Sequence, residues 1–479
     1  MSDSPAVSDS NTPSTASKPG PVPHTHPGYV GKCVLAPMVR TGELPTRLLA
    51  LRYGCDMVWG PEVVDKGIIG SERRENEAAD TVDFVKSGHN GKDQMVFRTH
   101  RTLEKERKKC IFQIGTANPE LAVQGAKLVA ADVAGVDVNA GCPKHFSIHS
   151  GMGAALLKTP ETLTAILRSL ITEVGKPFNI PISVKIRILD DLDSTLTLVR
   201  QLCETGVCRV TVHCRTAPMR PREAPIRDYL AAIADLCHSY NVACYANGDV
   251  RSRMHADEII SQYGVDGCMI AIAAEKNPSV FSTELARPWG EVVRNYLEYS
   301  QAIGHYFSNT KFCLNNLIPG AEEHGQKVTQ AKSVLGVCEI LGLPYKPLNA
   351  EIEKEDRESE EQAQALRAQK QKVKEAQEAN RLKQAQGKAK VKQHNLQKNK
   401  EKQKRLNEEK KKGNAERQKS ATPDRETQAV AGQKRKRGEG GKSMDREAGK
   451  SKKPEVAPEG PNAVDLSQPK KLVDAVAGQ

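Results

Sequence analysis

The chain has 479 residues, a formal net charge of +12 and 12 cysteines. No two cysteines form a CxxC pair, a spacing that excludes common zinc motifs and small disulfide frameworks and predicts an intracellular protein with reduced thiols. The polar, Ser- and Pro-rich start lacks the apolar core of a signal peptide, and no run approaches the roughly 18 apolar residues of a membrane span. We therefore expect a soluble cytoplasmic protein that does not engage membranes.

The positive charge is concentrated in the last quarter of the chain. Residues 351–479 hold 33 of the 71 Lys and Arg residues but only 22 of the 59 Asp and Glu residues. This tail contains no Cys, Phe, Tyr or Trp and can bury little apolar surface. A nearly neutral body with a basic tail indicates an anionic polymer as partner, and nucleic acid is favoured over membrane. Within the tail, Lys434–Arg437 has the composition of a nuclear localisation signal, so a nuclear pool is a further possibility.

Short apolar runs alternate with stretches of helical pattern after a disordered leader at residues 1–29. An open doubly wound sheet would give the same local pattern, but eight alternations favour a closed (β/α)8 TIM barrel over residues 30–283. No GxGxxG sequence follows the first strand, which argues against a Rossmann domain. The predicted strands are Cys33–Met38, Cys55–Trp59, Cys110–Gly115, Val136–Ala140, Ile182–Arg187, Cys208–His213, Val242–Asn247 and Val265–Ile272.

The pattern changes after the eighth strand. Residues 284–350 contain amphipathic helical stretches without strands, so we expect a small all-α domain there. Residues 351–419 are rich in Lys, Glu, Gln and Ala and could form a solvent-exposed helix without a sustained apolar seam. Beyond Ala421 the composition predicts disorder. The tail is equally compatible with a solvated linker and with a non-specific RNA contact.

In a TIM barrel the active site gathers at the carboxyl ends of the strands. The predicted strand ends place Gln113, Lys185 and His213 at one mouth, beside small-residue turns after the last two strands. An amide, a cation and a phosphate-binding turn are what a flavin mononucleotide (FMN) site requires. Cys142 lies there in a Gly-Cys-Pro turn beside Lys144, where a thiol can donate a proton. No carboxylate pair of glycosidase type and no cluster with metal-ligand spacing is evident.

Several motifs together resemble one family. They are VLAPMVRTG, FQIGTANPE, DVNAGCPK, GMGAALLKTP, VKIRI, TVHCRT and ANGDV, spread over roughly residues 31–350. They resemble tRNA-dihydrouridine synthases, and most of all the eukaryotic tRNA-dihydrouridine(20) synthase type.

The resemblance implies that NADPH, or NADH, reduces FMN, and that the flavin N5 passes hydride to C6 of uridine 20 in the tRNA D-loop while Cys142 protonates C5. It places the substrate near Asn139, Lys144, Arg187 and Arg215, and implies that the helical domain binds tRNA. A monomer would suit a protein that must wrap around a tRNA. It also implies a set of flavin contacts at Pro37, Met38, Val39, Gln113, Lys185, His213, Asn247, Gly248, Asp249, Ala271 and Ile272.

Two departures from the family pattern accompany the resemblance. Relatives often carry an arginine where this chain has Ile272, which predicts weaker binding of the FMN phosphate. Animal relatives also add a double-stranded-RNA-binding domain, for which only the basic tail could substitute here. Two alternative functions are a small-molecule flavoenzyme resembling dihydroorotate dehydrogenases and a non-catalytic RNA-binding barrel.

Overall fold

The computed structural model describes residues 26–88, 91, 93–102 and 106–418. The chain divides into two units, residues 1–382 and 383–479. Most of the predicted leader, the segment beyond Ala421 and the cluster Lys434–Arg437 lie outside the described residues, so their predicted disorder and signal stay predictions.

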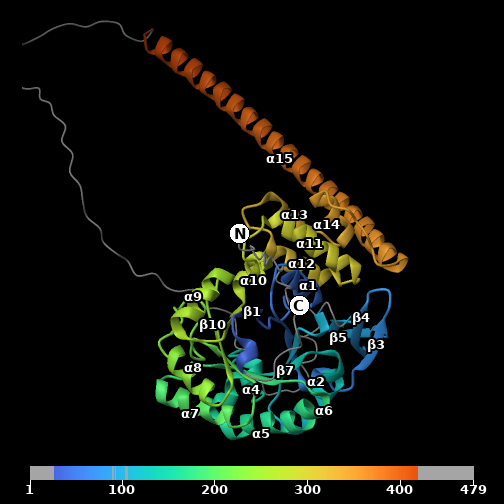
Figure 1. The fold of residues 1–479 in the computed structure, drawn as a ribbon. Coiled ribbons are helices and arrows are strands. Elements are labelled where there is room, and N and C mark those ends of the chain that lie inside the picture. Colours follow the sequence, from blue (N-terminus) through green and yellow to red (C-terminus); the bar gives the residue numbers. More distant parts are fainter. Residues whose placement is uncertain (1–25, 89–90, 92, 103–105, 419–479) are drawn as a thin grey trace, which may run out of the picture. The chain divides into compact units, whose positions relative to one another are not determined.

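The first unit contains a closed barrel of eight parallel strands, which confirms the predicted TIM barrel (Figure 1). Around the barrel the strand order is β1-β11-β10-β9-β8-β7-β6-β2, so the first and last strands pair and close the sheet. The strands are β1 (Lys32–Leu35), β2 (Val58–Val64), β6 (Cys110–Gly115), β7 (Gly135–Ala140), β8 (Ile182–Arg187), β9 (Arg209–His213), β10 (Ala243–Asn247) and β11 (Gly267–Ile270).

Seven predicted strands overlap closely with observed ones, but the second is displaced along the chain. The prediction covers Cys55–Trp59, whereas β2 begins at Val58, and its pairing with β6 shifts register between Trp59 and Glu62. The stretch before β2 is held by other contacts, since Asp56 accepts a hydrogen bond from the backbone N–H of Cys33. This register shift lets β2 continue through residues that interrupt its apolar run.

A three-stranded antiparallel sheet between β2 and β6 has no counterpart among the predicted elements. Its strands are β3 (Glu72–Asn76), β4 (Thr81–Ser87) and β5 (Asp93–His100), in the order β3-β4-β5. Val82, Phe84 and Phe97 are fully buried, while most of β3 is polar and exposed. A sheet with one apolar face gives a weaker sequence signal than a strand covered on both faces.

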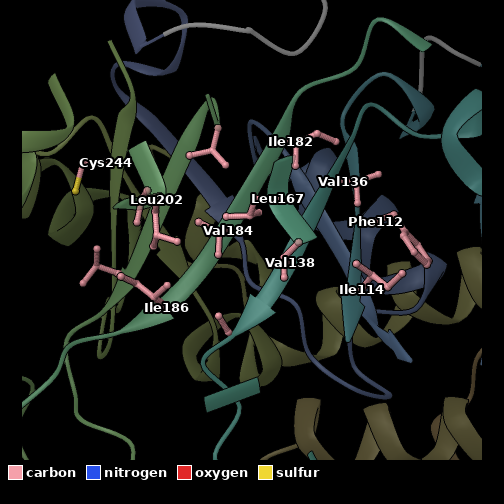
Figure 2. Close-up of a cluster of buried hydrophobic side chains, with 14 of the residues drawn as sticks. Phe112, Ile114, Val136, Val138, Leu167, Ile182, Val184, Ile186, Leu202 and Cys244 are labelled. Carbon is pink, nitrogen blue, oxygen red and sulfur yellow. The ribbon is translucent and has the colours of Figure 1, made fainter. Parts of the chain in front are cut away.

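Alternating residues of the barrel strands face two different environments. The outward-facing side chains join one apolar cluster with residues of helices α5 (Pro160–Leu170) and α7 (Leu192–Cys203), and Figure 2 labels Phe112, Ile114, Val136, Val138, Val184 and Ile186 of this cluster together with Leu167 and Leu202. The residues between them point the other way, because successive side chains alternate across a strand. Gln113, Asp137 and Lys185 thus belong to the barrel interior, where the candidate site lies.

Helices surround the barrel and follow it in the sequence (Figure 1). Those before residue 284 are α1 (Leu44–Arg52), α2 (Asp65–Ile68), α3 (Pro119–Val129), α4 (His145–His149), α5, α6 (Lys176–Phe178), α7, α8 (Leu230–Ser239), α9 (Arg253–Tyr263) and α10 (Ile272–Lys276). Among the described residues, no helix has both the length and the apolarity to cross a bilayer.

The predicted helical segment contains α11 (Trp289–Ala302), α12 (Phe307–Leu317), α13 (Glu323–Gln330) and α14 (Val334–Leu341), which share an apolar core. Leu49 of α1 joins that core, so barrel and bundle are packed together, and the boundary at 283/284 stays a prediction. The long helix α15 (Ala350–Gln418) follows; its first turns are held through Asp356, which accepts a hydrogen bond from Tyr345 at 2.9 Å.

Candidate active site

A cavity of about 710 Å³ opens at the carboxyl ends of the barrel strands. Its walls come from the ends of β1, β8, β9, β10 and β11 and from the loops that follow them, which is where TIM-barrel enzymes place their chemistry. Ten of the predicted site residues line it: Pro37, Lys185, Arg187, His213, Arg215, Asn247, Gly248, Asp249, Ala271 and Ile272.

Six predicted site residues are not part of the cavity wall: Met38, Val39, Gln113, Asn139, Cys142 and Lys144. Gln113 is buried, and its side-chain amide donates a 2.8 Å hydrogen bond to Asp137. Asp137 also accepts from Ser183, which in turn accepts from Arg209, so a polar chain runs through the barrel interior. The proposed contact between Gln113 and a flavin ring therefore stays a prediction.

Lys185 and His213 lie on the neighbouring strands β8 and β9, where His213 pairs with Arg187, and the charge of Lys185 influences the ionisation of His213. Burial and the charge of Arg187 lower the pKa of Lys185 to about 8. Burial, followed by the charges of Lys185, Arg187 and Arg215, lowers the pKa of His213 to about 2, so this imidazole is neutral at physiological pH. Positive charges that lie this close together destabilise the folded protein unless a bound anion neutralises them. The cavity is therefore a candidate anion-binding site.

The depressed pKa of Lys185 makes a prediction about stability. Protonated Lys185 is disfavoured in the folded protein below pH 8, and this cost is relieved as pH rises from about 8 toward the unfolded pKa of about 10.4. We expect Lys185→Met to stabilise the flavin-free protein by about 1–3 kcal/mol at pH 7, and by less at pH 10. Urea unfolding of both proteins at the two pH values measures the difference. A less stable variant at pH 7 would contradict the prediction.

The turn that carries Cys142 is held by its own neighbours. The Asn139 side-chain oxygen accepts from the backbone N–H groups of Gly141 at 2.9 Å and Cys142 at 3.1 Å. Arg187 donates to the carbonyl of Gly141 at 2.8 Å. Cys142 is half-buried, and its sulfur lies close enough to Lys185 to influence the pKa of that amine. The thiol is thus positioned beside the cationic cavity without lining it.

Gly153 explains why the sequence GMG follows the cysteine turn. Its φ is +59°, and a Cβ there would lie 2.6 Å from the Cys142 carbonyl oxygen and 2.4 Å from the Ser147 hydroxyl. Ala154 donates its backbone N–H to that same carbonyl at 2.9 Å. A side chain at residue 153 would therefore displace the segment that holds Cys142.

The segments after β9, β10 and β11 contribute three cations and one histidine that the sequence interpretation did not single out. Arg227, Arg251, His255 and Lys276 all line the cavity. The charge of Arg215 is already paired within the protein, because Arg215 forms a 2.6 Å ion pair with Asp249. These four residues lie beyond the strand ends in the sequence. A search confined to the strand ends therefore did not place them at the cavity.

Comparison with known proteins identifies the family. The profile of the dihydrouridine synthase (Dus) family matches residues 34–312, more than half of the chain, and the chain belongs to this family.

The similar curated proteins have related names. A Saccharomyces cerevisiae tRNA-dihydrouridine(20) synthase [NAD(P)+] is 46% identical over 323 residues, covering 65% of this chain and 84% of the relative. A Schizosaccharomyces pombe protein of the same name is 46% identical over 337 residues, covering 68% and 69%. A human tRNA-dihydrouridine(20a/20b) synthase [NAD(P)+]-like protein is 31% identical over 265 residues, covering 55% and 75%.

Proposed function

We propose that the chain is an NAD(P)H-dependent tRNA-dihydrouridine synthase that reduces the C5=C6 bond of uridine 20 in the D-loop. The observation that carries the proposal is the thiol of Cys142, fixed beside a cationic cavity at the mouth of a barrel of this family. Relatives that are 46% identical bear the name tRNA-dihydrouridine(20) synthase, which supports the choice of nucleotide.

The residues of the cavity suit FMN as the cofactor. A volume of about 710 Å³ lies in the usual range for ligand pockets, and the buried amine of Lys185, for which the described residues show no ion pair, favours an anionic ring edge. FMN, when bound, supplies a hydride for C6 of the uracil, with NADPH or NADH as the reductant. Pro37, Asn247 and Ala271 would contact it from three strand ends.

The protein's own groups complete the reaction. Cys142 would donate its proton to C5, so that hydride and proton together saturate the double bond. Asn139 keeps the cysteine turn in place. A uracil must leave its stack to reach a recessed barrel mouth, so we propose that the tRNA presents an extruded base. Lys144 and Arg215 are proposed to contact this base or the backbone beside it.

Beyond the barrel, we propose that α11–α14 bind tRNA and that the enzyme acts as a cytoplasmic monomer. A single chain of this kind can contact the tRNA body with the bundle while the base enters the barrel. The segment after residue 350 is proposed to add non-specific attraction to RNA phosphates.

The direct test incubates the purified chain with FMN, NADPH and an unmodified tRNA transcript, and maps dihydrouridine at single-nucleotide resolution. We expect one new dihydrouridine, at position 20. Free uridine monophosphate serves as the comparison substrate. Preferential reduction of the free nucleotide would favour a small-molecule flavoenzyme, and a protein that binds tRNA but no flavin would favour a non-catalytic barrel.

A further inference from the structure

The loop side of the cavity carries more positive charge than the protein neutralises. Arg227 comes from the loop between β9 and α8, Arg251 from the loop between β10 and α9, and Lys276 from the end of α10. Within the described part of the chain, no ion pair joins any of these three to a carboxylate. Asp249 is the one acidic residue in the described cavity wall, and its carboxylate already forms an ion pair with Arg215.

Arg227 is held in place while most of its guanidinium stays available. Its Nη2 donates to the carbonyl of Gly248 at 2.8 Å, and the side chain is half-buried. That bond ties the cation to the turn after β10, on the cavity wall. A guanidinium anchored by one nitrogen retains further donors in a fixed plane, which is the geometry that binds phosphate oxygens.

Arg251 and His255 form a second pair of donors on the same wall. The backbone N–H of Arg251 donates to Nδ1 of His255 at 3.2 Å, so the ring accepts at Nδ1 and carries its proton on Nε2. Burial, then the charges of Arg251 and Arg227, lowers the pKa of His255 below its ordinary value. The ring is thus a neutral donor beside two cations.

The backbone turn after β10 adds N–H groups without acceptors. Among the described residues, no hydrogen bond uses the backbone N–H groups of Gly248, Asp249 or Val250, although all three residues line the cavity. Gly248 has a φ of +115°, and a Cβ there would lie 3.1 Å from the His213 ring. Consecutive free N–H groups beside arginines are a recurring anion receptor.

Ile272 stands at the start of α10, half exposed on the same wall, and supplies no charge. We propose that Arg227 and Arg251, from the two preceding loops, bind the phosphate of FMN and take the place of a cation at position 272. The inference rests on the proposed function, and it names the residues that select FMN over unphosphorylated riboflavin. Ile272 by itself suggests weak binding of the FMN phosphate, but with the two arginines we expect the phosphate to be bound firmly.

A phosphate monoester carries about −1.5 to −2 charges at neutral pH, which matches two arginines and a neutral donor. Phosphodiesters of a tRNA backbone share the same chemistry with one charge each. The phosphate of a flavin is favoured over a tRNA phosphate because the two arginines line the same cavity of about 710 Å³ as Lys185 and His213, a volume in the usual range for small-molecule ligands.

The test measures dissociation constants of FMN and riboflavin by flavin fluorescence, using the full-length chain freed of flavin. Wild-type protein is expected to prefer FMN. Arg227→Gln and Arg251→Gln should each weaken FMN roughly tenfold or more, the effect of losing a hydrogen bond to a charged group, and leave riboflavin unchanged. Arg222→Gln is the matched control, an exposed arginine of the same loop that does not line the cavity.

A gain-of-charge variant provides the second arm. Adding Ile272→Arg to Arg227→Gln should restore part of the FMN preference, because a cation returns to the same wall. Equal weakening of FMN and riboflavin, or unchanged FMN binding, would overturn the inference while leaving the proposed cofactor intact. A variant that raises only the KM for tRNA would assign the cations to RNA instead. Failure of wild-type protein to bind either flavin would refute the proposed cofactor itself.

Discussion

Replacing Cys142 with alanine is expected to lower the rate of uridine reduction by roughly 10²–10⁴-fold, the usual contribution of a positioned general acid. The fold should survive, because Cys142 is half-buried and its backbone, which makes the turn's hydrogen bonds, is retained. Hydride could still reach C6, but no side chain at residue 142 would then deliver a proton to C5.

Single-turnover kinetics separates the two halves of the reaction. Reduction of bound flavin by NADPH should proceed at the wild-type rate in Cys142→Ala, whereas dihydrouridine formation on tRNA should nearly stop. Cys142→Ser serves as a companion variant, since it keeps a much weaker acid in the same place. Wild-type rates of dihydrouridine formation in the alanine variant would show that another group donates the proton. Loss of flavin reduction as well would indicate damage to the whole site.

Removing the charge of Glu106 is expected to destabilise the fold by about 3–5 kcal/mol, the cost of leaving a buried charge unpaired. Arg47 and Glu106 are fully buried and 2.6 Å apart, and Arg47 also donates to the carbonyls of Gly42 and Arg98. Glu106 further accepts a 2.7 Å hydrogen bond from Thr99. The pair therefore ties α1 to the end of β5, a strand of the antiparallel sheet.

The same pair predicts a dependence of stability on pH. Burial alone would raise the pKa of Glu106, but the Arg47 charge and several hydrogen bonds outweigh burial and lower it. A depressed carboxyl pKa contributes stability above the unfolded value of about 4.3, and this contribution is lost as pH falls through the folded pKa. Wild-type protein should lose this stability below about pH 4, and Glu106→Gln should lack that dependence.

Denaturant unfolding at pH 7 and at a series of pH values below 4 measures both effects. Glu173→Gln is the control, because Glu173 pairs with Lys127 on the surface, where an ion pair contributes about 0–1 kcal/mol. The double variant Arg47→Met/Glu106→Leu should recover much of the loss, since apolar groups can replace a buried pair. A single Glu106→Gln variant as stable as wild type would mean that water reaches the pair.

The barrel was accessible from the sequence because parallel strands covered on both faces leave continuous apolar runs. Lys185 was recognisable for a related reason, since a lysine inside such a run requires an anion or pays for burial. Cys142 stood out through its Gly-Cys-Pro turn, and Gly153 shows that the following glycines serve that turn. The antiparallel strands β3–β5 escaped notice because one face is solvated and its polar residues conceal the apolar alternation.

What the sequence by itself determined is the eight strands of the barrel, the kind of chemistry at their ends and the membership in a family. Only the tertiary structure decided which loop residues join that chemistry. Arg227 and Arg251 reach the cavity because β1 pairs with β11 and closes the barrel, which brings every βα loop to one mouth. Local patterns encode which face of a strand is buried, whereas the neighbours of a loop cation depend on closure of the whole sheet.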